Sequence, residues 1–138
     1  MIEDDELLSV VRQWVQKAEN DLKNAAYTLR MGKDCPTDTV CFHAQQCAEK
    51  YLKALLVLRE LDFPRMHDMS QLIALLPVQA RPTLTPEEQE RLTDYATVTR
   101  YPGDYEPISL TETRRALRIA RQIRSAIRKR LPKKVLRA

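Results

Sequence analysis

The 138-residue chain has little glycine, few aromatic residues and no long apolar run. It contains two glycines, and Phe, Trp and Tyr make up 6% of it. So little glycine argues against a fold of strands and tight turns, and the abundant Ala, Leu, Arg, Lys, Glu and Gln favour helices. No apolar segment approaches the length of a membrane-spanning helix, which is about 20 residues. The acidic start of the chain, Glu3-Asp4-Asp5, has the opposite charge to the basic start of a signal peptide. We therefore expect one all-helical cytoplasmic domain over residues 1–138.

Cysteine is scarce as well, which limits redox and metal chemistry. The odd number, three, cannot pair completely, and Cys41 and Cys47 stand on different sides of one helix. We interpret Cys35, Cys41 and Cys47 as buried reduced thiols. A redox role is the alternative. The chain has no CxxC pair, glycine-rich phosphate loop, G-x-S-x-G, H-E-x-x-H or calcium loop, and its carboxylates do not form the E-x-x-H pattern of di-iron bundles. The sequence predicts neither a metal nor a cofactor.

Apolar residues recur at three- and four-residue steps in four long segments. They predict helices at about 7–29, 37–61, 85–99 and 109–131, and a short fifth helix from Asp68 to Pro77. Asp68 is placed to cap the short helix, and Thr85 with Glu88 forms a capping box. Short connections favour an antiparallel four-helix up-and-down bundle with the additional short helix. We expect residues 132–138 to be a mobile tail.

The second of these helices is apolar around most of its circumference and has one polar stripe. At about 100° per residue, His43, Gln46, Glu49, Lys50 and Lys53 fall on that stripe. A single polar stripe on a buried helix predicts a groove or an interface. Lysines there can bind phosphate oxygens, and Gln46 can read a base edge. His43 is either a boundary histidine bonded to a neighbour or a ligand contact.

Charge is divided unevenly along the chain. No Asp or Glu follows Glu112, so residues 1–113 carry a net charge of −7 and residues 114–138 carry +11. One interpretation is a solvated helix face whose basic C-terminal end interacts favourably with the negative end of the helix dipole. The other is a basic strip for the phosphates of RNA or a nucleotide, or for an acidic protein. The arginines that share one face of the last helix are Arg114, Arg118, Arg121 and Arg128.

Several segments resemble, in order, those of the HEPN family ("higher eukaryotes and prokaryotes nucleotide-binding" domains). The resemblance spans roughly residues 10–131 and implies a helical bundle that forms a homodimer. It also implies binding of RNA or a nucleotide such as ATP, and partnership with a small nucleotidyltransferase in a toxin-antitoxin-like pair. The matching segments are Trp14-x-x-x-Ala18-x-x-Asp21-Leu22, the helix at 41–56, Pro64-x-x-His67-Asp68-Met69, Thr99-Arg100-Tyr101-Pro102 and the last helix at 116–131.

HEPN ribonucleases carry an R-x(4–6)-H motif, in which arginine and histidine from two protomers meet at the scissile phosphate. Arg100 matches the arginine, but the positions that follow it after four to six intervening residues hold Tyr105, Glu106 and Pro107. No histidine follows His67, and an unperturbed tyrosine is a weak base at neutral pH. The sequence therefore favours binding over catalysis, with a divergent metal-independent ribonuclease toxin as the alternative.

The segment around Arg100 and the His67-Asp68 pair complete the candidate sites. Arg100 can bind phosphate and Tyr105 can stack on a base, with Asp104 beside them. Alternatively, Arg100 pairs with Asp104 and the tyrosine packs beneath the loop. His67 and Asp68 follow a proline at a helix entrance, and we expect them to hold that turn.

Overall fold

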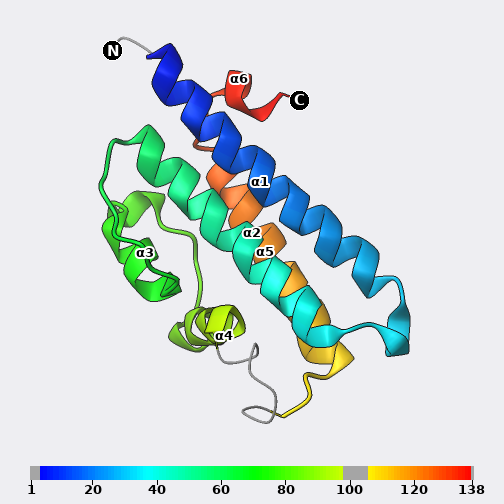
Figure 1. Cartoon of the computed structure of the whole chain (residues 1–138). Coiled ribbons are helices and arrows are strands. Elements are labelled where there is room, and N and C mark those ends of the chain that lie inside the picture. Colours follow the sequence, from blue (N-terminus) through cyan, green and yellow to red (C-terminus); the bar gives the residue numbers. More distant parts are fainter. Residues whose placement is uncertain (1–3, 98–105, 138) are drawn as a thin grey trace.

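The computed structural model describes residues 4–97 and 106–137, and the regular structure in these ranges is entirely helical. Three long helices lie side by side, with α1 opposite in direction to α2 and α5 (Figure 1). This confirms the all-α bundle. No described helix is both long and apolar enough to cross a bilayer. The elements are α1 (Asp5–Leu29), η1 (Gly32–Asp34), α2 (Thr37–Leu58), α3 (Met69–Leu75), η2 (Val78–Ala80), α4 (Pro86–Thr97), α5 (Leu110–Arg128) and α6 (Lys133–Leu136).

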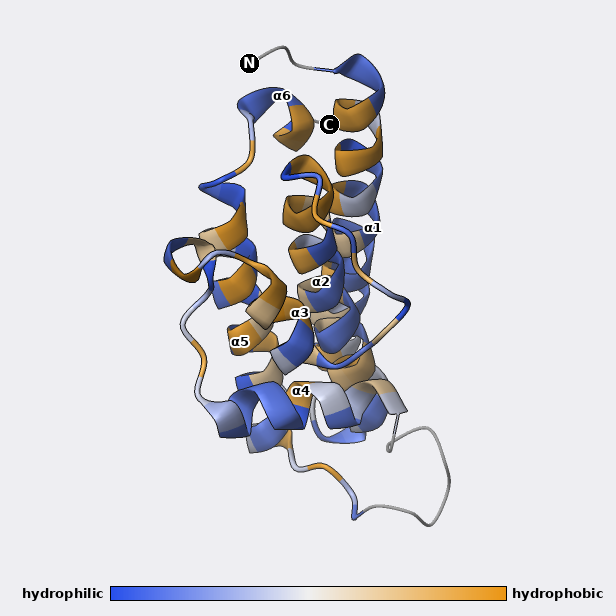
Figure 2. Cartoon of the chain, turned by 90° about the vertical axis from the view of Figure 1, so that its left-hand side faces the viewer, coloured by the Kyte–Doolittle hydropathy of each residue, from blue (hydrophilic) through white to orange (hydrophobic). Residues whose placement is uncertain are grey.

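Helix α4 does not follow the axis of the other long helices. Figure 2 shows it lying across the lower end of the bundle, where it packs against α2 and α3. Its buried residues are only Leu92, Tyr95 and Ala96. This short apolar stripe covers one end of α2 and is too short to extend along its length.

Helix α2 is the centre of the fold. It packs against α1, α3, α4 and α5, and Tyr51, Leu52, Leu55 and Leu56 are fully buried. The apolar surplus that the sequence shows on this helix is therefore covered within the chain. The covered surface of α2 gives no support to a dimer through this helix, and the expectation of a homodimer depends on the family resemblance.

The helix starts expected from capping residues are present. Asp68 accepts hydrogen bonds from the backbone N–H groups of Ser70 (3.0 Å) and Gln71 (3.2 Å). At the start of α4, the Thr85 N–H donates to Glu88 Oε1 (2.9 Å) and the Glu88 N–H donates to Thr85 Oγ1 (3.1 Å). Both caps supply partners for backbone donors that a helix cannot pair internally.

The C-terminal segment, which we expect from the sequence to be a mobile tail, contains one more short helix. Residues 133–136 form α6, whose Val135 is buried. The Arg12 guanidinium on α1 donates to the Lys134 carbonyl over 2.9 Å. Val135, the partly buried Leu136 and the hydrogen bond from Arg12 thus help to hold this single turn against the bundle.

The three cysteines are free and buried, as the sequence predicts. Burial raises the pKa of both the Cys41 and the Cys47 thiols to about 12. At neutral pH these thiols stay protonated and behave as small apolar side chains.

Candidate functional site

One edge of the polar stripe on α2 is paired with a carboxylate of α1. Nδ1 of His43 lies 2.8 Å from Oδ1 of Asp21, and Nζ of Lys50 donates to Oδ2 of the same carboxylate over 2.5 Å. The side chain of Asp21 is only 11% exposed, while His43 and Lys50 are about one quarter exposed or less. His43 therefore sits at a boundary, bonded to a neighbour. A role in ligand contact remains a prediction for both His43 and Lys50.

The other edge of the stripe is organised around Glu49. This carboxylate accepts hydrogen bonds from Gln45 Nε2 (2.9 Å) and Lys53 Nζ (2.9 Å), and Nδ1 of His67 lies 2.8 Å away. Gln46 donates to the amide oxygen of Gln45 over 2.7 Å. Burial opposes ionisation of Glu49, but the bonds from Gln45, His67 and Lys53 together hold its pKa below the ordinary range. His67 thus ties the turn before α3 to α2, which agrees with a structural role.

Lys53 points into the protein. Its side chain is 9% exposed, and its ammonium lies 5.7 Å from the ring centroids of both Trp14 and Phe63. The two rings meet edge to face at 6.4 Å. Ring faces and the Glu49 carboxylate replace the water that the ammonium loses on burial. A ligand phosphate would have to displace these partners to reach Lys53.

The arginines of α5 are placed differently. Arg114, Arg118 and Arg121 are exposed, and none of them forms a hydrogen bond or ion pair within residues 4–97 and 106–137. They span roughly 10 Å of helix axis at 1.5 Å per residue. Arg128, at the end of the strip, is partly buried and donates to the Tyr51 hydroxyl over 3.1 Å. We call these four residues the α5 strip.

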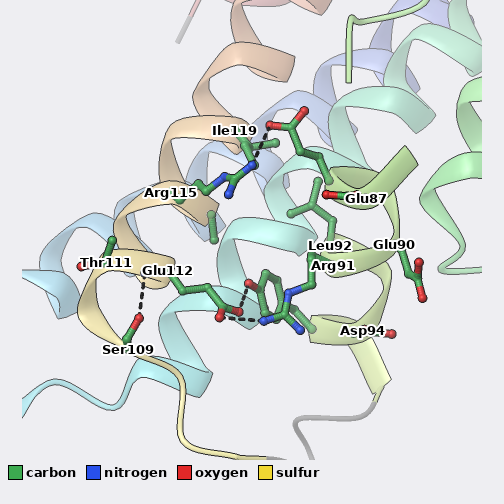
Figure 3. A pocket seen from close by; sticks show the side chains of 13 residues that line it. Glu87, Glu90, Arg91, Leu92, Asp94, Ser109, Thr111, Glu112, Arg115 and Ile119 are labelled. Atoms are coloured by element: carbon green, nitrogen blue, oxygen red, sulfur yellow. Dashed lines mark hydrogen bonds and ion pairs between the residues drawn. The ribbon is translucent and has the colours of Figure 1, made fainter. Parts of the chain in front are cut away.

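A pocket of about 530 Å³ lies between α4 and the start of α5 (Figure 3). Arg91 donates to Glu112 over 2.7 Å, and Arg115 lies 3.9 Å from Glu88. Figure 3 shows Asp94 on the outer side of α4, turned away from α5. Five carboxylates and these two arginines line the pocket, so its charge disfavours phosphate groups. The carboxylates are Glu87, Glu88, Glu90, Asp94 and Glu112.

The family model of the HEPN domain matches residues 11–130. The chain belongs to the HEPN family. Two solved structures are similar to this HEPN chain over most of its length. The protein TT1696 from Thermus thermophilus has a TM-score of 0.73 and 28% identity, over 88% of this chain and 98% of its own. ST0689, described as an archaeal HEPN homologue, has a TM-score of 0.67 and 27% identity, over 87% of this chain and 96% of its own. No curated protein matches the chain.

Part of the candidate site of this HEPN chain lies outside the described residues. Arg100, Asp104 and Tyr105 belong to the segment 98–105, which joins α4 to the residues before α5. Their proposed contacts with phosphate and base remain predictions. Both histidines of the chain are described, and each lies against a carboxylate of the bundle.

The sequence patterns did not single out the partners of the polar stripe. Asp21 appears in the resemblance to the HEPN first helix, but without a role in pairing His43 and Lys50. A usable signal exists, because Asp21 lies within about 40° of the buried Ala25 on the helical wheel. A carboxylate at the edge of an apolar face requires a cation or hydrogen-bond donors when the helix is packed. The rings around Lys53 leave no such signal, because Trp14 and Phe63 are far apart in sequence.

Proposed function

We propose that this HEPN chain is a nucleotide- or RNA-binding module that acts in the cytoplasm as a homodimer and as the partner of a small nucleotidyltransferase, in a toxin-antitoxin-like pair. One observation carries the binding part of this proposal, namely the exposed arginines of α5 that have no partner among the described residues. Membership of the HEPN family supports the remaining parts.

The contrast between α2 and α5 supports α5 as the binding surface. Lys50 and Lys53 of α2 are neutralised by Asp21 and Glu49, so a phosphate would compete with a carboxylate for each of them. No acidic residue follows Glu112 in the chain, and the exposed face of α5 consequently lacks a counter-charge on its own helix. Guanidinium groups pair with phosphate through two parallel hydrogen bonds, which suits them to this role.

The homodimer and the transferase partner are proposed on different grounds from the binding surface. Because α2 is covered by four helices of its own chain, a dimer would use another surface. Sedimentation equilibrium would test it, and a monomer at micromolar concentration would contradict it. Co-purification with the product of a neighbouring nucleotidyltransferase gene would test the partnership. A protein that elutes alone after co-expression would argue against it.

The ribonuclease alternative gains no support from the described residues. The family's ribonuclease motif places its histidine after Arg100, whereas both histidines of the chain precede Arg100 and lie with Nδ1 against Asp21 or Glu49. The role of Arg100 depends on a segment outside the described residues. Cleavage of RNA by the purified protein, abolished in Arg100→Ala, would revive this alternative.

Binding to a labelled single-stranded RNA, followed by fluorescence anisotropy at several salt concentrations, tests the proposal. Three phosphate contacts predict a slope of about −2 in log K against log salt, and Arg118→Gln should reduce its magnitude by about 0.7. Arg65→Gln removes the same charge from an exposed loop position and serves as the control. A salt slope near zero, or equal losses in the two variants, would refute α5 as the binding surface.

A further inference from the structure

A second, smaller cavity lies at the opposite end of α5 from the α4 pocket, between α1 and α6. Its volume is about 150 Å³, and its charged lining consists of Arg12, Glu19, Lys23, Arg128 and Arg137. The side chains come from three parts of the chain, namely α1, the end of α5 and the residue after α6. The cavity therefore exists only when α6 packs against the bundle.

Glu19, the one carboxylate among the described residues that line this cavity, is already paired. Glu19 accepts from Arg124 Nε (2.7 Å) and Nη2 (3.0 Å), and from the Tyr51 hydroxyl (2.5 Å). Arg124 is not part of the cavity lining and cancels the charge of Glu19 from the inner side. Among the described residues, four cations consequently remain around the cavity without a compensating acid.

These four cations have spare hydrogen-bond donors. Arg12 uses one N–H on the Lys134 carbonyl, and Arg128 uses one on the Tyr51 hydroxyl. In the described part of the chain, neither Lys23 nor Arg137 has a hydrogen-bond or ion-pair partner. A guanidinium carries five N–H donors and an ammonium three. Like charges repel when they gather around one small cavity, and an anion within it would turn this repulsion into attraction.

We propose that this cavity binds a phosphate group, supplied either as inorganic phosphate or as the terminal phosphate of a nucleotide. Pockets for whole drug-sized ligands measure roughly 300–1,000 Å³, so about 150 Å³ suits one anionic group whose remaining parts stay outside. The bound phosphate group contacts both α1 and Arg137, the residue after α6. The proposal goes beyond the nucleic-acid surface of α5, because Arg12, Lys23 and Arg137 take no part in the α5 strip.

The test is a titration of the ¹⁵N-labelled protein with sodium phosphate, at an ionic strength held constant with sodium chloride. We expect saturable NMR shifts at the side-chain N–H groups of Arg12 and Arg128 and at the amides of α6. Lys23→Gln and Arg137→Gln should each weaken binding roughly three- to tenfold, the range for one hydrogen bond between charged groups at a partly exposed site. Arg118→Gln is the matched control and should leave the phosphate titration unchanged.

The outcomes separate this proposal from the proposed function and identify the source of the phosphate. Shifts that stay linear, or an equal loss in Arg118→Gln, overturn the phosphate site. If Arg118→Gln loses RNA but keeps phosphate, both proposals are supported independently. ATP that competes with inorganic phosphate at the same signals, while adenosine does not, identifies a nucleotide phosphate. ATP that leaves the phosphate signals unchanged identifies free phosphate as the ligand.

Discussion

The buried pair of Glu49 and Lys53 allows a quantitative prediction. Their charged atoms are 2.9 Å apart, and both side chains are less than 10% exposed. At an effective dielectric constant of about 20, this distance gives an attraction of about 6 kcal/mol, most of which is offset by the loss of hydration. Removing one partner removes the attraction and leaves the other charge buried.

The two single substitutions should differ. Glu49→Gln leaves the Lys53 ammonium with a neutral amide oxygen and two ring faces, and should cost about 3 kcal/mol of unfolding free energy. Lys53→Met should cost less, about 1–2 kcal/mol, because Glu49 keeps the hydrogen bonds from Gln45 and His67. The double variant buries no charge at this position. It should lose about 2 kcal/mol, well below the sum of the single losses.

Urea unfolding at pH 7 measures these differences. Far-UV circular dichroism follows the helices, and Trp14, the only tryptophan, reports on the surroundings of Lys53 by its fluorescence. The two signals should change together if unfolding is two-state. Arg115→Met, which removes an exposed cation 3.9 Å from Glu88, is the control and should cost less than about 1 kcal/mol. The reasoning is refuted if Lys53→Met costs more than Glu49→Gln, or if the two losses add.

Three further predictions concern acid stability, capping and thiol reactivity. The folded-state pKa of Glu49 lies below its ordinary value of 4.5, so the stabilisation from its charge is present above pH 4.5 and is lost as the pH falls further. Between pH 5 and pH 3, the melting temperature should therefore fall less steeply in Glu49→Gln than in the unchanged protein. Equal slopes of melting temperature against pH would contradict this prediction. Thr85→Ala should cost about 1 kcal/mol in urea unfolding by removing the capping box with Glu88, and an unchanged midpoint would contradict this. Cys41 and Cys47 should react with a thiol reagent in urea but very slowly in the native protein, and fast native reaction would show that they are accessible.

The helical elements could be predicted from the sequence because they depend on local patterns. The starts of α3 and α4 follow from Asp68 and Thr85, whose side chains bond to backbone groups two or three residues away. The buried stripe of α5, including Ile123 and Ile127, follows from the helical period alone. Interactions within one or two turns can be read directly from the order of residues.

The placement of α4 and α6 could not be predicted in this way. Whether α4 runs along or across the bundle depends on how its short apolar stripe meets α2 and α3, which are distant in sequence. The docking of α6 depends on Val135 and on an Arg12 that is 122 residues from its acceptor. Long-range packing of this kind leaves no periodic signal, and an isolated four-residue helix has little stability of its own.

Ion pairs between residues distant in sequence also explain where positive charge remains available on the surface. Glu19 and Asp21 are two residues apart on α1, so they point to different sides of that helix. Asp21 pairs with Lys50 of α2, and Glu19 pairs with Arg124, which reaches back from α5 toward α1. Arg118 and its neighbours lie on the outer face of α5, where these carboxylates cannot reach, and their own helix has no acid after Glu112. A phosphate should therefore bind on α5 in preference to α2, although α2 also carries Lys50 and Lys53.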